Sequence, residues 1–235
     1  MAQSRRVAQG DALTEAVLFD FNGVLVDDEA QHCWALQRVL ADEAITVTRE
    51  QYYATYLGLD DRTGFAEAFR RAQRTLTTEF LKYLVEKKSK IYLDLVATSF
   101  SMVAGAEAFV HDAGTRFRLG IVSGALRREI DAVLTRTSIA GSFEVIIAAG
   151  DVRDSKPDPA GYLAAHKAFD QQRPLAVNGC VVIEDSLHGL AAAKTAGMPC
   201  VMLTTNHPST TLEGRGAALI WESLAGHSAN EIAAL

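Results

Sequence analysis

Four short groups of polar residues in this chain have side chains suited to handling a phosphoryl group. Three of them follow apolar runs and one stands in a loop: Asp20, Ser123 with Gly124, Glu184 with Asp185, and Lys156. Mg²⁺ is usually held by one or two carboxylates together with phosphate. A hydroxyl and backbone N–H groups suit phosphate oxygens, and a lysine neutralises the charge of the transferred group. Each group alone has an ordinary explanation, such as a helix cap or a surface lysine, but together they predict Mg²⁺-dependent phosphoryl transfer.

These side chains come together only if a sheet aligns the ends of several strands. Short apolar, β-favouring runs alternate with helical patterns from residue 103 onward, after a first such run near the start of the chain. The runs cover residues 17–19, 117–122, 143–148, 180–183 and 200–203. Strand–helix alternation predicts βαβ units and a doubly wound, mostly parallel sheet of the α/β class. Ligands bind outside the carboxyl ends of such strands, which is where the polar groups stand.

A helical insert is predicted directly after the first strand. Residues 28–97 contain no convincing buried strand and give helical patterns instead, so we expect a cap subdomain there, placed as a lid over the site. The α/β core would then consist of residues 15–27 and 98–235. Residues 1–14 are polar and aperiodic and are predicted to form a flexible tail.

Composition limits the possible partners and location. The 235 residues are 49% hydrophobic and 22% charged, with a formal net charge of −6, which argues against a general nucleic-acid or anionic-membrane surface. The widely spaced Cys33, Cys180 and Cys200 fit reduced thiols, and no apolar run reaches membrane-spanning length. We expect a cytoplasmic protein that acts on a small phosphorylated metabolite, as a monomer or a homodimer.

The polar groups also carry a resemblance to a known family. In order along the chain they resemble the four signature motifs of the haloacid dehalogenase (HAD) superfamily, over about residues 16–205. The motifs are Asp20-Phe-Asn-Gly-Val24, Ser123-Gly124, Lys156-Pro157, and Glu184-Asp185-Ser186 with Gly189 and Ala196-Gly-Met198. The helical insert is similar to the cap of the subfamily that contains phosphoglycolate phosphatase and β-phosphoglucomutase. The resemblance implies a HAD-like Rossmannoid core with an inserted cap.

The resemblance also implies a role for each motif residue. Asp20 would be the nucleophile that forms an aspartyl-phosphate. Ser123 and Gly124 would hold the phosphoryl oxygens, and Lys156 would bridge Asp20 and the phosphate. The implied metal ligands are Asp20, the backbone carbonyl of Asn22, Asp185 and, as a further candidate, Glu184.

Asn22 departs from the family pattern. Phosphatases and mutases of the family have an aspartate here that protonates the leaving group, and such help is worth about 10²–10⁴-fold in rate. Four explanations stay open: a slow enzyme or one acting on esters with good leaving groups, another group in its place, a binding protein without turnover, or an engineered residue. If only proton transfer is missing, Asn22→Asp is expected to raise turnover at least about tenfold.

Two residues of the predicted cap are candidates for contact with the substrate. His32 corresponds to a histidine that mutase-like members place at the cap hinge, and it could replace the missing acid, although it could also be a helix-surface histidine. Arg62, in a loop with two glycines, could grip distal anionic or hydroxyl groups or could simply be solvated. An arginine cannot form the imine that phosphonatases use, and Glu184 with Asp185 argues against the metal-free dehalogenases.

The function predicted from the sequence is therefore a Mg²⁺-dependent phosphatase of small phosphorylated metabolites, such as a sugar or hydroxy-acid phosphate. A β-phosphoglucomutase-like isomerase is the nearest alternative, but it needs an acid–base group near position 22. A protein that binds a phosphorylated metabolite without turnover is the alternative from another class.

Overall fold

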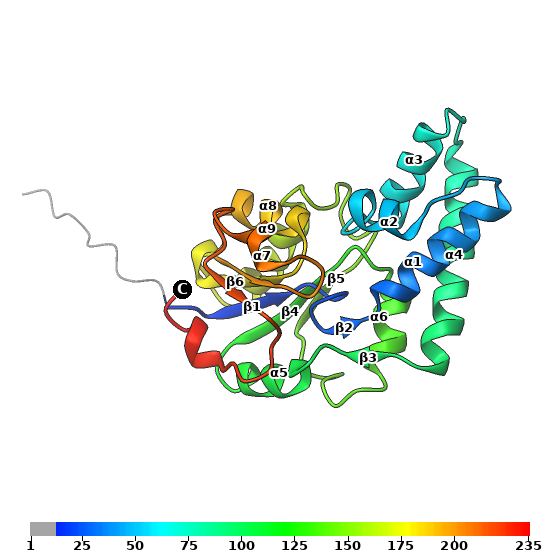
Figure 1. Cartoon of the computed structure of the whole chain (residues 1–235). Coiled ribbons are helices and arrows are strands. Elements are labelled where there is room, and N and C mark those ends of the chain that lie inside the picture. Colours follow the sequence, from blue (N-terminus) through cyan, green and yellow to red (C-terminus); the bar gives the residue numbers. More distant parts are fainter. Residues whose placement is uncertain (1–12) are drawn as a thin grey trace, which may run out of the picture.

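The computed structural model describes residues 13–235, and its centre is a six-stranded parallel sheet (Figure 1). The strand order is β5-β4-β1-β6-β7-β8, so β1 has a neighbour on each side. The strands are β1 Ala16–Phe19, β4 Arg118–Val122, β5 Val145–Ile147, β6 Cys180–Glu184, β7 Cys200–Leu203 and β8 Leu219–Trp221. Phe19 is level with Ile121 of β4 and Ile183 of β6, so the three central strands end together. The predicted α/β fold with a mostly parallel sheet is confirmed.

Helices cover both faces of the sheet. Successive side chains of β1 point to opposite faces, so this strand contributes to two buried clusters. Val17 and Phe19 lie in a buried cluster with α5, α6 and the C-terminal turn η2. Ala16 and Leu18 lie in a second cluster, with α7 and α8. The bounds are α5 Ala106–Gly114, α6 Arg127–Leu134, α7 Ala160–Gln172, α8 Leu187–Ala196, α9 Ser209–Leu212, η1 Val177–Gly179 and η2 Ala229–Ile232.

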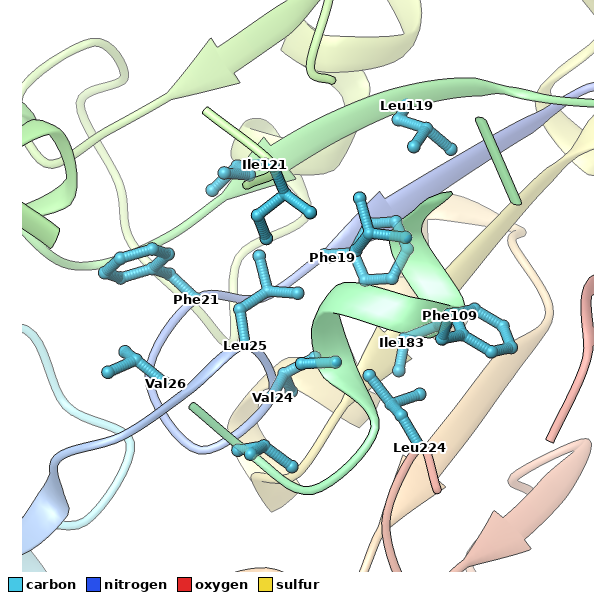
Figure 2. Close-up of a cluster of buried hydrophobic side chains, with 14 of the residues drawn as sticks. Phe19, Phe21, Val24, Leu25, Val26, Phe109, Leu119, Ile121, Ile183 and Leu224 are labelled. Atoms are coloured by element: carbon cyan, nitrogen blue, oxygen red, sulfur yellow. The ribbon is translucent and has the colours of Figure 1, made fainter. Parts of the chain in front are cut away.

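The first of these clusters fixes the end of β1, which the site depends on (Figure 2). The Phe19 and Phe109 rings meet edge to face with centroids 6.3 Å apart, and Ile183 and Leu224 lie in the same cluster. All four side chains are essentially inaccessible to solvent. Burial of such a side chain contributes about 1.5–3 kcal/mol, so the residue before Asp20 is firmly held.

Four helices, here called the cap helices, lie at one end of the molecule beyond the sheet (Figure 1). They are α1 Glu29–Asp42, α2 Arg49–Thr55, α3 Asp61–Arg71 and α4 Thr78–Thr98. Thr48, Asp60 and Thr77 cap the last three by accepting a hydrogen bond from a backbone N–H in the first turn. The cap helices bury a third apolar cluster of their own, which includes Phe65 and Phe69. The chain enters and leaves them through two short antiparallel strands, β2 Val26–Asp27 and β3 Ser101–Met102.

Three details differ from the sequence-based expectations. Strands β2, β3 and β8 were not expected, because each has only two or three residues. A glycine after a helical run, such as Gly114, is typical of a left-handed helix cap, but α5 includes Gly114. Thr115 takes the capping position with φ −76°, and its hydroxyl donates to the Asp112 carbonyl. The tail was expected to reach residue 14. Thr14 is instead buried and donates from its hydroxyl to the Ile232 carbonyl at 2.6 Å, while residues 1–12 lie outside the described part.

Within residues 13–235, none of the helices combines the length and the apolar character needed to cross a membrane.

Candidate active site

Three carboxylates meet at the carboxyl edge of the sheet. The Asp20 backbone N–H donates to the Ile183 carbonyl at 2.9 Å, which continues the β1–β6 ladder and sets Asp20 beside the end of β6. Glu184 is the last residue of β6 and Asp185 follows it. The carboxylates of Asp20, Glu184 and Asp185 each have an oxygen within 4.8 Å of the others. The alignment of strand ends expected from the sequence therefore brings these three side chains together.

Lys156 lies between two of these carboxylates. It stands in the loop after β5, and its Nζ is 2.8 Å from Asp20 Oδ1 and 2.6 Å from Glu184 Oε1. Burial opposes the positive charge of Lys156, but the Asp20 and Glu184 carboxylates outweigh it and raise the lysine's pKa. The ammonium group therefore stays charged at neutral pH and is held beside Asp20.

Glu184 is saturated with protein donors. Its Oε1 accepts from Lys156 and from the Tyr162 hydroxyl at 3.0 Å. Its Oε2 accepts from the backbone N–H groups of Asp185 and Ser186, each at 2.9 Å, and from the Ser186 hydroxyl. Glu184 is fully buried, so this network orients Lys156. Lys156 is paired with only one oxygen of Asp20, Oδ1. Asp20 and Asp185 are therefore better placed than Glu184 to bind a metal.

The charge balance of the cluster suits a divalent cation. Three buried carboxylates face the single ammonium group of Lys156. Burial and the Glu184 carboxylate raise the pKa of Asp20 to about 7 despite Lys156. Burial and the carboxylates of Glu184 and Asp20 raise the pKa of Asp185 well above its usual range. Oxygen ligands with excess negative charge are what Mg²⁺ requires, so the residues fit this ion.

A glycine lets the backbone after Asn22 approach Asp185. Gly23 has φ +75°, and a Cβ added there would lie 2.1 Å from Asp185 Oδ2. The Asn206 side chain holds the same Asp185 oxygen, with its Nδ2 at 2.6 Å. The sequence did not indicate Asn206, because it lies in a loop outside the recognised motifs.

Ser123 and Gly124 line the same cavity as Asp20 and Lys156. The Ser123 hydroxyl accepts from the Ala125 N–H at 3.0 Å and lies 3.5 Å from Asn22 Oδ1. This pair precedes the helix that follows, because α6 begins only at Arg127. The turn after β4, rather than a helix end, presents the hydroxyl and N–H groups to the cavity.

Asn22 is hydrogen-bonded to a buried carboxylate, Asp28, which the sequence does not indicate. Its Nδ2 donates to both oxygens of Asp28, at 2.9 and 3.1 Å. Asp28 is inaccessible to solvent and also accepts from the Tyr92 hydroxyl. An aspartate at position 22 would put two carboxylates in contact. The amide at position 22 and the acid at position 28 therefore form a matched pair.

His32 is a cavity residue and not a helix-surface histidine. It is 8% exposed, stacks on Tyr92 with ring centroids 4.3 Å apart, and has Nε2 3.0 Å from Asn22 Nδ2. The same Nε2 is 3.5 Å from Asp28 Oδ2, and Nδ1 is 2.6 Å from the Lys88 ammonium. Burial and Lys88 oppose a charge on the ring, but the nearby carboxylates outweigh them and raise the pKa of His32.

The prediction that Arg62 contacts the substrate is wrong. It is exposed and is absent from the cavity wall, which Asp61 joins instead. Asp60 caps α3, so the first helical turn directs Asp61 inward, and Arg62 is rotated by about 100° relative to it. The cation on the cap side is Lys88, 3% exposed and paired with Asp61. The sequence gives little sign of it, since it is one of four lysines in α4.

The cap helices close over the sheet edge through one loop. Asp60 accepts a hydrogen bond from the Ser155 hydroxyl and lies against Gly124. Gly58, with φ +76°, is close enough to Ser186 that an added Cβ would lie 2.9 Å from the serine Cβ. The cavity is thus bounded by the three strand-end motifs below and by α1, α3 and α4 above.

Similarity to known proteins identifies the class to which the chain belongs. The family model of haloacid dehalogenase-like hydrolases matches residues 17–203, and the chain belongs to this family. It is 28% identical over 210 residues to the phosphorylated carbohydrates phosphatase of Thermotoga maritima, covering 88% of this chain and 94% of that one. It is 26% identical over 208 residues to the phosphoglycolate phosphatase of Caulobacter vibrioides, covering 88% and 86%.

Solved structures agree on the fold. CbbY of Rhodobacter sphaeroides in complex with phosphate superposes with a TM-score of 0.81 at 24% identity, covering 94% of this chain and 99% of that one. The β-phosphoglucomutase of Clostridium difficile gives the same TM-score at 21% identity, covering 94% and 96%. At these identities the likeness concerns the fold alone.

Proposed function

We propose that the protein is a Mg²⁺-dependent phosphatase that hydrolyses phosphate monoesters of small metabolites through an aspartyl-phosphate. The observation that carries this proposal is the cluster of Asp20, Asp185 and Glu184 with Lys156 at 2.8 Å from Asp20. Membership of the hydrolase family and relatives named as phosphatases support it. When bound, Mg²⁺ would be held by Asp20, Asp185 and the Asn22 carbonyl, and it would offset negative charge on the phosphoryl group.

The chain's own residues supply the covalent step. An Asp20 oxygen attacks phosphorus, the ester P–O bond breaks, and the phosphoryl group is carried on the Asp20 carboxylate. Lys156 and the Ser123–Gly124 turn hold the phosphoryl oxygens, and Lys156 remains ionised for this purpose. Water then attacks phosphorus, releases phosphate and regenerates the carboxylate.

The proton for the leaving alkoxide is assigned to His32. Asn22 cannot donate a proton near neutral pH, whereas the His32 ring lines the cavity within 3.5 Å of Asp28. His32 Nε2–H gives its proton to the ester oxygen as the P–O bond breaks, while the Lys88 ammonium beside Nδ1 passes a proton to the ring. When water attacks, Nε2 takes a proton from the water and Nδ1 returns its proton to Lys88. Asp28 lies 3.5 Å from Nε2 and favours a proton on that nitrogen, whereas Nδ1 accepts from Lys88.

An isomerase has no comparable support. A mutase must move protons at both sugar hydroxyls, and Asn22 removes the group that the family uses for this. The other alternative, a binding protein without turnover, is distinguished from a phosphatase by measuring phosphate release.

The test is phosphate release from a panel of sugar, polyol and hydroxy-acid phosphates, with and without Mg²⁺. We expect release that needs Mg²⁺ and is lost in Asp20→Asn. His32→Gln is expected to lower kcat by about 10²-fold or more if the imidazole carries the proton. The exposed His111, on α5, provides the matched control His111→Gln. Ligands that raise the melting temperature without any phosphate release would contradict the phosphatase and indicate a binding protein.

A further inference from the structure

In addition to the carboxylates around Lys156, the cavity has an acidic wall, most of which comes from the cap side. The carboxylates on this wall come from two cap helices, the loop before α3 and the first turn of α6: Glu29, Asp60, Asp61 and Glu129. Among the described residues that line the cavity, Lys88 is the only lysine or arginine besides Lys156. This wall therefore keeps an excess of negative charge.

Lys88 is not free to bind a second anion. Its ammonium is paired with Asp61 at 2.5 Å and contacts His32 Nδ1 at 2.6 Å. Its side chain is 3% exposed, so it cannot turn toward a ligand without losing these contacts. Arg62 is exposed outside the cavity. A substrate carrying a carboxylate or a second phosphate at this wall would meet acids without a free cation.

Most acids of the wall have partners within the protein. Glu29 accepts from the Tyr52 hydroxyl. Asp60 accepts from the Thr63 N–H and from Ser155. The hydrogen bonds of Glu29 and Asp60 are thus made within the protein, and these two carboxylates need no ligand.

Glu129 is the exception. It is 1% exposed, and its Oε2 accepts from the Leu126 N–H at 3.0 Å, but among the described residues its Oε1 has no hydrogen-bond partner. A buried carboxylate oxygen without a donor is costly, and more so for a charged group than for a neutral one. Because Glu129 lines the cavity, a ligand can supply the missing donor.

We propose that the substrate is a phosphate monoester whose far end carries a protonated amine, which donates to Glu129 Oε1. This inference rests on the proposed phosphatase function and narrows its substrate class. A hydroxyl would supply the hydrogen bond but leave the charge of the wall uncompensated, whereas an ammonium group supplies both. Hydroxy-acid phosphates and bisphosphates are disfavoured, because their second anion faces Asp61 and Glu129.

Three six-carbon esters phosphorylated at the same position test the proposal on the unmodified protein with Mg²⁺. They are glucosamine 6-phosphate, glucose 6-phosphate and 6-phosphogluconate, with an amine, no further charge and a carboxylate. We expect kcat/KM to fall in this order, with the amino ester about tenfold or more above the neutral one, as a charged hydrogen bond predicts. Equal values for the amino and neutral esters, or a faster acidic ester, would overturn the amine site and leave the phosphatase intact. Absence of phosphate release from these and from the wider panel would instead refute the phosphatase itself.

A variant assigns the preference to one residue. Glu129→Gln keeps the shape and an acceptor for the Leu126 N–H but removes the charge, so the ratio of kcat/KM between the amino and neutral esters is expected to drop about tenfold. The control Glu86→Gln changes a carboxylate that is 63% exposed, paired with Arg128 and outside the cavity. Its ratio should equal that of the parent. An unchanged ratio in Glu129→Gln would refute the assignment, and the three-ester comparison decides even if that variant does not fold.

Discussion

At the scale of single residues, Asn22 is best understood together with Asp28. The amide donates to both oxygens of a carboxylate that is wholly buried, and the Tyr92 hydroxyl donates to the same group. The amide thus donates hydrogen bonds to the buried Asp28 carboxylate, whereas an aspartate at position 22 would repel it. Asn22 therefore has a local structural reason: the Asp28 carboxylate, six positions later in the chain, faces it.

Two variants test this pairing. Asn22→Asp is expected to lower stability by on the order of 2 kcal/mol and to give no tenfold gain in kcat, because two buried carboxylates would compete for one proton. The exchange variant Asn22→Asp with Asp28→Asn restores a donor–acceptor pair and should recover most of the melting temperature. Thermal unfolding and steady-state hydrolysis provide the measurements. A single Asn22→Asp variant that is stable and ten times faster would show that only proton transfer was missing.

The sequence was sufficient for residues that follow a strand and insufficient for those that reach the site from helices. Asp20, Ser123 and Asp185 follow recognisable apolar runs, so their meeting point could be predicted. Lys88 and Glu129 are ordinary charged residues of amphipathic helices, and only the docking of those helices turns them inward. The sequence favours Arg62 over Asp61 as a contact residue, because the rotation of α3 about its axis is not visible in a loop sequence.

At the scale of elements, helix α8 constrains the Glu184 side chain, because the helix begins three residues after Glu184, at Leu187. Ser186 caps the helix by accepting from the Gly189 N–H at 3.0 Å, which brings Gly189 against the Glu184 carboxylate. A Cβ added at Gly189 would lie 1.7 Å from Glu184 Oε1. Alanine normally stabilises a helix relative to glycine, but here it has no room.

Gly189→Ala is therefore expected to displace Glu184 and, with it, Lys156. We expect a loss of about 1–3 kcal/mol in the free energy of unfolding, as for overpacked cores, and a marked fall in kcat. Gly141→Ala is the matched control, since an added Cβ there meets nothing within 4 Å. Chemical denaturation and hydrolysis of the best panel substrate measure both effects. If the two variants behaved alike, Glu184 would not be the constraint that holds Lys156.

The main strands could be predicted because each is a continuous apolar run, and the cap helices because each has a helical periodicity over enough length. Helix α4 shows what periodicity cannot reveal. Leu84 and Val85, in its first half, pack in the cap cluster, whereas Tyr92 and Val96, in its second half, pack in the core cluster. A single helix thus belongs to both parts, and its apolar spacing does not say where the change occurs.

At the scale of the whole molecule, the carboxylate cluster makes stability depend on pH and Mg²⁺. The pKa of Asp20 rises from 3.8 to about 7 on folding, mainly because the group is buried. Below the lower value both states hold the proton. Between the two values only the folded state holds it, so stability falls as pH rises toward 7 and levels off above it.

We therefore expect the melting temperature of the metal-free protein to decrease by several degrees between pH 5 and pH 7.5. Mg²⁺ at saturating concentration binds the ionised carboxylates, so it should raise the melting temperature above pH 7 and flatten this dependence. Asp20→Asn should lack the part of the slope that comes from this group. A slope that is the same with and without Mg²⁺, and in the variant, would contradict the assignment of this cluster as a metal site.

The small β2–β3 ribbon has a consequence for how such a molecule can change over evolutionary time. Val26 and Met102 are paired, so the two ends of the intervening segment are neighbours in space. Replacing everything between them requires no cut in the central sheet and leaves Asp20, Lys156 and Asp185 in place. Domain insertions are best tolerated where the ends of the inserted segment meet. The fold thus separates inheritance of the nucleophile from inheritance of the groups around the leaving group. Exchange of the cap helices replaces the residues there, His32 included, while Asp20, Lys156 and Asp185 are passed on unaltered.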